Sequence, residues 1–284
     1  MNINIRGRLM DLSIPRVMGI INVTTDSFYS GSRYGSMEEV KRVAEKMLVE
    51  GADMIDIGGC SSRPGAQEVS EEEELRRVCE SVSVVKRLAP EVIISVDTYR
   101  SSVAESAVTG SGADIINDIS GGNIDKMMFP LIKKLKVPYI MMHMQGTPAT
   151  MQNSPSYSDV VAEILSWFAP RISELQSEGV KDIIIDPGFG FGKTTEHNFE
   201  MLRRLDEFSV TGLPVLVGLS RKSMIWRTLD ITPEEALTGT AALNMAALMH
   251  GASVIRAHDV KEAREVVTLF EKIYPHGVHF NHYY

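Results

Sequence analysis

Short runs of aliphatic and β-branched residues alternate along the chain with longer stretches in which apolar residues recur every three or four positions. A short apolar run predicts a buried strand, whereas the longer spacing predicts a helix with one buried face. The predicted strands are residues 17–24, 54–58, 92–97, 114–119, 139–143, 182–186, 214–219 and 253–258. The predicted helical regions are residues 37–51, 71–88, 101–110, 127–136, 158–176, 197–208, 223–249 and 261–274.

This alternation of strands and helices is typical of an α/β protein with a parallel sheet. Eight strand–helix pairs are the number that closes a (β/α)8 TIM barrel, and 284 residues suit that fold. We therefore predict one domain over residues 1–284, with the barrel over 15–275, a short N-terminal cap under the barrel, and a flexible tail over 276–284. A doubly wound open sheet is the alternative, because periodicity does not show whether the end strands pair.

Polar or charged residues stand at or just after the C-terminal end of every predicted strand. In a barrel these ends meet at one mouth, where the active sites of this fold lie. Some of the side chains could instead cap the following helix, but that explanation does not extend to all eight strands. The residues are Asn22, Asp56, Asp97, Asn117, Asp118, His143, Asp186, Ser220, Arg221, Lys222, Arg256, His258 and Asp259.

The chemistry of Asp97, Asn117 and Asp186 predicts a pocket for a flat heterocycle. Buried carboxylates need N–H donors, because an unpaired buried polar group costs about 1–3 kcal/mol and an unpaired charge costs more. A heterocycle with amino and ring N–H groups along one edge would supply those donors, and Lys222 could donate to a ring carbonyl or nitrogen. A second, cationic zone suits a phosphate or diphosphate. It consists of Asn22, Arg63, Arg256 and His258.

Composition narrows the class of protein. The net charge of −8 argues against nucleic-acid partners, because no excess of Lys and Arg is present to neutralise phosphates. Cys60 and Cys79 are too few for a disulfide framework. Residues 1–20 lack a signal-peptide core, and no apolar run reaches the roughly 20 residues of a membrane helix. We therefore expect a cytoplasmic protein without a membrane partner.

Two local patterns look functional, but we do not interpret either as a binding site. The acidic run at residues 71–74 follows Ser70 and predicts a solvated helix start, where carboxylates favour the helix dipole. The segment PGFGFGKT at residues 187–194 looks like a phosphate loop. That pattern needs glycine where Pro187 stands, so we reject a nucleotide-binding fold.

Nine short segments resemble the dihydropteroate synthase family. They follow the family's order over nearly the whole chain. Each segment alone is weak evidence for the family, whereas the nine together are highly specific for it. They are NVTTDSF at 22–28, GGCSSRPGA at 58–66, SVDT at 95–98, IINDIS at 115–120, MHMQG at 142–146, DPGFGFGK at 186–193, LSRKSMI at 219–225, GTA at 239–241 and RAHDV at 256–260.

The resemblance implies a (β/α)8 transferase of folate biosynthesis. Family members join 6-hydroxymethyl-7,8-dihydropterin pyrophosphate to p-aminobenzoate and release 7,8-dihydropteroate and pyrophosphate, with Mg²⁺ as cofactor. The implied route is dissociative, so the C–O bond breaks before the amine attacks. Members are sulfonamide targets and commonly form homodimers, which makes the two substrates and a second copy of the chain the implied partners.

The resemblance also assigns residues, position by position. The pterin site would consist of Asp97, Asn117, Met142, Asp186, Phe191, Lys222 and Arg256. The diphosphate site would consist of Asn22, Ser62, Arg63, Arg256 and His258, with Asn22 as the metal ligand. The p-aminobenzoate pocket would consist of Phe28, Pro64, Phe191, Lys222 and Ser223. The implied catalytic residues are Asp97, Asp186, Lys222, Arg63 and Arg256.

Three positions depart from the family's pattern, and two other functions stay open. Thr25 replaces the usual proline, Cys60 the usual glutamate and Ser62 the usual threonine, which bears on kinetics and drug response rather than identity. A methyltetrahydrofolate–corrinoid methyltransferase would share the pterin site, but Arg63, Lys222 and the RAHDV segment argue against it because it needs no diphosphate site. A non-catalytic pterin-binding paralogue would not need both loop motifs.

Overall fold

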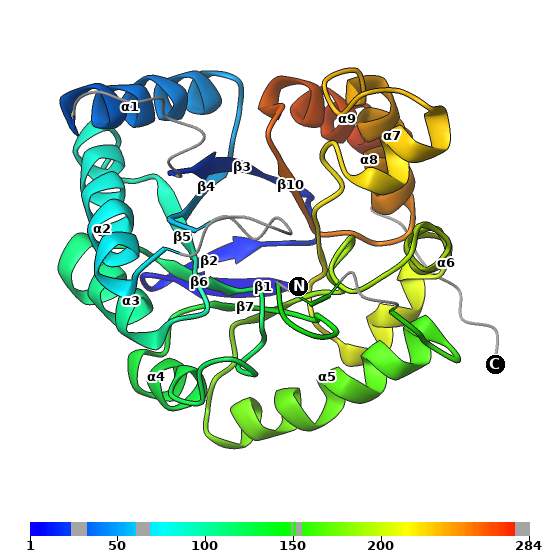
Figure 1. The fold of residues 1–284 in the computed structure, drawn as a ribbon, viewed down its shortest axis with the longest axis horizontal. Helices are drawn as coiled ribbons and strands as arrows, with labels where there is room; N and C mark the ends of the chain where they lie inside the picture. Colours follow the sequence, from blue (N-terminus) through cyan, green and yellow to red (C-terminus); the bar gives the residue numbers. More distant parts are fainter. Residues whose placement is uncertain (24–32, 61–68, 149, 152–154, 276–284) are drawn as a thin grey trace.

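The computed structural model describes residues 1–23, 33–60, 69–148, 150–151 and 155–275, and these form a barrel of strands inside a ring of helices (Figure 1). The barrel strands are β3 (Arg16–Asn22), β4 (Met54–Gly58), β5 (Ile93–Asp97), β6 (Ile115–Asp118), β7 (Tyr139–Met142), β8 (Ile183–Asp186), β9 (Leu216–Val217) and β10 (Val254–Ala257). The α-helices are α1 (Arg33–Val49), α2 (Glu71–Leu88), α3 (Ser101–Ser106), α4 (Met128–Leu135), α5 (Val160–Ser177), α6 (Thr195–Arg203), α7 (Ser223–Leu229), α8 (Leu237–Met249) and α9 (Val260–Ile273). Among the described helices, none is both long and apolar enough to cross a membrane.

The sheet closes on itself. Its strand order is β8-β7-β6-β5-β4-β3-β10-β9, and every pairing for which a register is given is parallel. The two ends of that order meet in a parallel bridge between Ile185 and Val215, beside a hydrogen bond of 3.0 Å from the Ile185 N–H to the Pro214 carbonyl. The predicted (β/α)8 barrel is therefore confirmed, and the doubly wound open sheet is excluded.

One predicted helical region, residues 223–249, is two helices. α7 ends at Leu229 because Asp230 adopts a left-handed backbone conformation with φ 53°. Pro233 follows three residues later, and proline cannot continue a helix from its middle. The chain turns over residues 230–236 before α8 begins. The sequence prediction missed this break because aspartate ends a helix in the left-handed conformation only occasionally.

Alternate side chains of each barrel strand point inward and outward. The outward side chains pack against the helices, for example Ile55 and Ile57 of β4. The inward ones nearest the N-terminal strand ends are apolar, and they pack with a hairpin of β1 (Asn2–Ile5) and β2 (Arg8–Asp11). This basal cluster consists of Ile3, Ile5, Leu12, Met18, Met54, Ile115, Ile140, Ile184, Leu216 and Val254.

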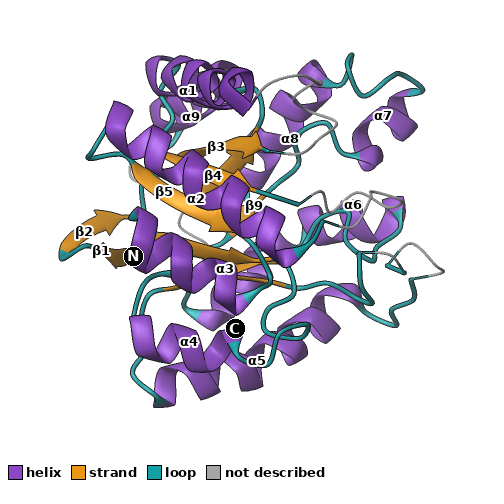
Figure 2. Cartoon of the chain, turned by 60° about the vertical axis from the view of Figure 1, so that its left-hand side comes forward, coloured by secondary structure: helices purple, strands orange, loops and turns teal. Residues whose placement is uncertain are grey.

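The hairpin is the cap that the sequence placed under the barrel, although its two strands were not predicted. Figure 2 shows it at the end of the barrel where the strands begin. Polar contacts fasten it there, because the Asn4 N–H donates to Asp182 at 2.7 Å and Arg6 donates to the buried Asp114 at 2.6 Å. The base of the barrel is thus a packed apolar plug, which leaves the opposite end for the polar residues.

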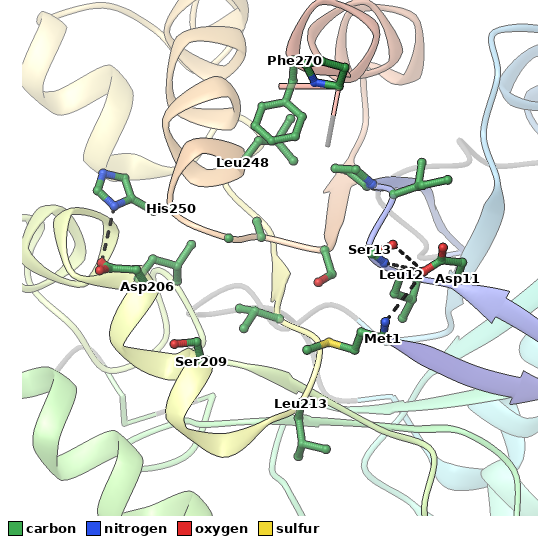
Figure 3. Close-up of a pocket in the computed structure, with 18 residues that line it drawn as sticks. Met1, Asp11, Leu12, Ser13, Asp206, Ser209, Leu213, Leu248, His250 and Phe270 are labelled. Atoms are coloured by element: carbon green, nitrogen blue, oxygen red, sulfur yellow. Dashed lines mark hydrogen bonds and ion pairs between the residues drawn. The ribbon is translucent and has the colours of Figure 1, made fainter. Parts of the chain in front are cut away.

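A cavity lies beside the hairpin, near the N-terminal ends of β3, β9 and β10 (Figure 3). His250 and Asp206 form an ion pair of 3.5 Å on one side of it, and Phe270 and Leu248 supply apolar surface. The hairpin therefore leaves this part of the base uncovered. Because the cavity is at the base, it is separate from the polar residues at the strand ends.

The acidic run at the start of α2 is only partly solvated, which corrects the prediction. Ser70 caps the helix as expected, since its Oγ accepts from the Glu73 N–H at 3.3 Å. Glu74, however, is fully buried and accepts hydrogen bonds of 2.6 Å from both Thr98 Oγ1 and Arg100 Nη1. Its carboxylate fastens the first turn of α2 to the segment that follows β5.

We predict that Ile3→Ala lowers the free energy of unfolding by about 2–5 kcal/mol, because it opens a void in the basal cluster. Ile3 is 1% exposed there. The matched control is Leu9→Ala in the same hairpin, since Leu9 is 73% exposed and should change stability by about 0.5 kcal/mol or less. Urea denaturation measures both. Equal losses would show that the hairpin does not complete the core.

Candidate active site

Inward-facing side chains at the C-terminal strand ends gather at the mouth of the barrel, opposite the basal cluster. Two of them lie beside Gly58, where a Cβ would make ordinary van der Waals contact with Asn22 Oδ1 at 3.6 Å and with Asp97 Oδ2 at 3.7 Å. The mouth contains Asn22 of β3, Asp56 of β4, Asp97 of β5, Asn117 of β6, Met142 of β7, Asp186 of β8 and Arg256 of β10. One end of the barrel therefore carries most of the residues that the sequence predicted for the site.

A buried network joins four of these side chains. Asp56 is fully buried, and its Oδ2 accepts from Arg256 Nε at 2.7 Å and from Asn117 Nδ2 at 3.1 Å. Arg256 also donates from Nη2 to Asp97 Oδ2 at 2.8 Å. The guanidinium thus lies between two carboxylates and links β4, β5, β6 and β10. The sequence marked Asp56 only as a strand-end residue, and its role as the anchor of Arg256 was missed.

Two carboxyl groups of this mouth, those of Asp97 and Asp186, have raised pKa values. Burial raises the pKa of Asp97 to about 7, although Arg256 opposes the shift, and the neighbouring Asp56 adds to it. Burial also raises the pKa of Asp186, opposed by the charge of Lys222 and by a hydrogen bond of 2.7 Å from the Gly188 N–H. One oxygen of Asp56, Oδ1, is buried without a partner. The described residues of the mouth therefore leave at least one buried carboxylate oxygen without a donor.

Lys222 is near Asp186 and contacts an aromatic side chain of the loop after β8. Its Nζ donates to the Phe189 carbonyl and sits 4.4 Å from the centre of the Phe191 ring. Burial lowers the pKa of Lys222 to about 8, and the charge of Asp186 opposes that shift. Phe191 itself packs on an apolar cluster at the mouth, made of Ile119, Met142, Met144 and Met151. A flat apolar surface therefore stands beside the polar edge.

The remaining predicted residues lie at the rim or outside the described residues. His258 is exposed just after β10, with its Nδ1 3.0 Å from Ser220 Oγ. Ser223 is half-buried and begins α7, directly after Lys222. Five positions fall within residues 24–32 and 61–68, outside the described part of the chain. They are Thr25, Phe28, Ser62, Arg63 and Pro64.

Some strand-end residues serve the scaffold instead of the mouth. Asp118 accepts from the N–H groups of Ser120 and Gly122 and from the Tyr139 hydroxyl, at 2.7–2.8 Å. Arg221 and Asp259 form a two-pronged ion pair with distances of 2.9 and 3.0 Å. The alternative that a strand-end position has a purely structural use thus holds for these.

Cys60, one of the three departures from the family's pattern, stays a thiol. Burial raises its pKa to about 12, and the neighbouring charge of Glu74 adds to the shift. At neutral pH the side chain is therefore uncharged. The segment after β4 carries one negative charge fewer than it would with glutamate at this position.

Comparison with known proteins identifies the family that shares these features. The family model described as pterin binding enzyme matches residues 18–258. The dihydropteroate synthase of Escherichia coli (strain K12) is 46% identical over 271 residues, which cover 94% of each chain. A Yersinia pestis dihydropteroate synthase solved with a sulfonamide drug has a TM-score of 0.90 at 41% identity, over 97% of this chain and 100% of that one. The Xanthomonas albilineans enzyme with 4-aminobenzoic acid has a TM-score of 0.88 at 37% identity, over 96% and 97%.

The raised pKa of Asp97 predicts a specific dependence of stability on pH. In the unfolded chain an aspartate titrates near pH ~3.9, so between about pH 4 and pH 7 the folded protein binds the extra proton. The contribution of Asp97 to the free energy of unfolding is therefore full below pH ~4 and is lost as the pH rises to about 7.

Asp97→Asn should remove this contribution while it keeps an oxygen acceptor for Arg256. Urea denaturation of both proteins at intervals from pH 4.5 to pH 8 is the measurement, because this range covers most of the ~3-unit window in which the two protonation states differ and extends above it. The stability of the native protein relative to the variant should fall across the window and level off above it. Parallel curves would contradict the assignment.

Proposed function

The chain belongs to the pterin-binding enzyme family as a dihydropteroate synthase, and we propose that the mouth of its barrel is where the reaction takes place. The reaction joins 6-hydroxymethyl-7,8-dihydropterin pyrophosphate to p-aminobenzoate and yields 7,8-dihydropteroate and pyrophosphate. The observation that supports this site most directly is the donor-poor carboxylate network of Asp56, Asp97 and Asp186, held around Arg256 and Lys222.

In the proposed complex, the pterin edge lies against Asp97, Asn117 and Asp186, and Lys222 donates to the ring. The pterin's amino and ring N–H groups supply the hydrogen-bond donors that the buried carboxylates lack, which favours their ionised forms. Met142 and Phe191 provide the apolar surface for its flat face. Arg256 covers the other face. A planar ligand rich in N–H groups along one edge would thus complete a site that is incomplete without it.

The diphosphate and Mg²⁺ belong at the rim. We assign the diphosphate to Asn22, Ser62, Arg63, Arg256 and His258, and the metal to Asn22. Among the described residues no three His, Cys, Asp or Glu side chains gather as a metal site. A single amide oxygen nevertheless fits Mg²⁺, which is often held by one or two protein oxygens together with substrate phosphates and water. When bound, the ion would offset the negative charge of the departing diphosphate.

The p-aminobenzoate pocket would adjoin the pterin at the Phe191 ring. Phe191 and Lys222 are in contact there, and Ser223 follows Lys222 at the start of α7. Phe28 and Pro64 complete the assignment from the sequence alone. We propose that sulfonamides occupy the same pocket, as inhibitors that imitate the aminobenzoate ring.

The proposed route breaks the C–O bond before the new bond forms. The electron pair leaves with the diphosphate, the pterin methylene becomes a cation, the amine nitrogen attacks it, and the extra proton passes to solvent. Asp97 and Asp186 stabilise the cation, while Arg63, Arg256 and His258 stabilise the leaving group. No general base is needed, because an aniline-type nitrogen is nucleophilic while neutral.

A cytoplasmic homodimer remains part of the proposal. All thirteen residues of α8 are uncharged, and it is apolar over much of its circumference. Leu229 at the end of α7 and Met249 at the end of α8 are exposed large apolar side chains. A surface of this kind favours contact with another protein, and a second copy of the chain is the proposed partner.

We predict that the purified chain with Mg²⁺ releases pyrophosphate at an appreciable rate only when both substrates are present. Each substrate alone is the control. A coupled phosphate assay gives the rate, and chromatography of the products identifies dihydropteroate. Absence of that product would overturn the proposed function, whereas methyl transfer to a corrinoid protein would support the methyltransferase instead.

Mutations in the pterin zone and in the diphosphate zone of the site should have different effects on binding and on turnover. Asp97→Asn should raise the dissociation constant of the pterin about 10–100-fold, because it removes a charged acceptor worth about 1.5–3 kcal/mol. Arg63→Ala should leave pterin affinity within about twofold and lower kcat about 100-fold, because it removes charge stabilisation of the leaving group. Calorimetry and steady-state kinetics measure the two effects. Equal losses of pterin affinity would contradict the division.

A further inference from the structure

Lys193 is a charged side chain in the interior, with only 3% of its surface exposed. Its Nζ donates to the carbonyl oxygens of Gly188 at 3.0 Å and Phe191 at 2.9 Å, and it lies 3.1 Å from Nδ1 of His143. These contacts use all three N–H bonds of an ammonium group. Burial nevertheless lowers the pKa of Lys193 to about 7, against the opposing charge of Asp186, so keeping a lysine here is costly.

His143 acts as the fixed partner of this ammonium at the end of β7. Burial and the charge of Lys193 lower the pKa of His143 to about 2, so its ring is neutral. A neutral ring that accepts at Nδ1 carries its proton on Nε2. The ring is also held edge-on to Trp167, with centroids 5.1 Å apart. Lys193 is therefore tied to a rigid strand end and not only to its own loop.

The loop that Lys193 closes, residues 187–193, follows a path that requires glycine at three positions. Gly188, Gly190 and Gly192 all have positive φ, between 63° and 80°. At Gly188 and Gly192 a Cβ would overlap the carbonyl oxygens of His143 and Gln145, so the loop lies directly on the segment after β7. The alternating glycines send Phe189 into the main core and Phe191 to the mouth.

The same loop seats Lys222. The Phe189 carbonyl accepts a hydrogen bond from Lys222 Nζ, and the Phe191 ring lies under that ammonium at 4.4 Å. Lys193 holds the carbonyls of Gly188 and Phe191, one on either side of the Phe189 carbonyl along the loop. Burial raises the pKa of Asp186, the carboxylate that attracts Lys222, and the charge of Lys193 is among the charges that oppose this rise.

We propose that Lys193 is a positioning residue for the pterin site, which acts through Lys222. It gathers the loop carbonyls into the one arrangement in which Phe189 and Phe191 hold the Lys222 ammonium beside Asp186. The inference rests on the proposed role of Lys222 in pterin binding. Under this proposal the lysine of the PGFGFGKT segment has a role other than phosphate binding, because protein groups enclose its Nζ.

A double-mutant cycle tests the proposal, with 6-hydroxymethylpterin as the probe and calorimetry as the measurement. In the native background, Lys193→Met should raise the dissociation constant about tenfold, which corresponds to about 1.4 kcal/mol. In the Lys222→Met background, the same change should raise it less than about twofold, because coupled residues give non-additive effects. Equal increases in both backgrounds would overturn the proposal. If the native chain does not bind the pterin, the proposed function fails instead.

The control variant is Tyr157→Phe, which removes another hydrogen bond to the same loop. The Tyr157 hydroxyl donates to the Gly192 carbonyl at 2.9 Å, away from Phe189. This change should leave pterin affinity within about twofold if the effect of Lys193 is specific. Thermal unfolding checks that every variant is folded. If Lys193→Met does not fold, Lys193→Gln replaces it, and failure of both to fold would overturn the proposal in favour of a purely structural lysine.

Discussion

The placement of Arg256 between Asp56 and Asp97 is the interaction on which the mouth of the barrel depends. Its guanidinium ties β10 to β4 and β5, and through Asn117 the same network reaches β6. The carboxyl groups of Asp56, Asp97 and Asp186 lie near the cations Arg256 and Lys222, and the charge of Lys193 also acts on Asp186. Burial is the main reason why the pKa of Asp97 and that of Asp186 are raised, and a ligand with N–H donors would complement these carboxyl groups.

The period of the strands makes this arrangement possible. Along β4 the inward positions change from Met54 at the base to Asp56 and then to Gly58 at the rim. Most strands thus contribute an apolar side chain to the plug and a polar one to the mouth, while their outward side chains build the core under the helices. The loop after β8 adds what the strands cannot, an aromatic ring and a carbonyl that face Lys222.

Much of the fold and of the mouth could be predicted from the sequence, because the signals that begin and end strands and helices are local. β4 and α2 have the predicted bounds, since their apolar runs end at clear polar or capping residues. The strand-end rule found the mouth residues because parallel strands bring their C-terminal ends together. The bridge between Ile185 and Val215 could not be predicted, because it joins segments whose pairing depends on the twist of the whole sheet. Glu74 was misjudged because its partners, Thr98 and Arg100, lie beyond the next strand.

The basal hairpin has a consequence for the order in which the molecule can be completed. Ile3 and Ile5 are made well before Leu216 and Val254, yet all four residues belong to the same buried cluster. Contacts between residues so far apart form late, because a long loop must close before they are rewarded. Ile3, Ile5 and Leu12 can therefore be fully buried only after β9 and β10 have been made, so during synthesis these three apolar side chains stay exposed until the last strands of the barrel are present.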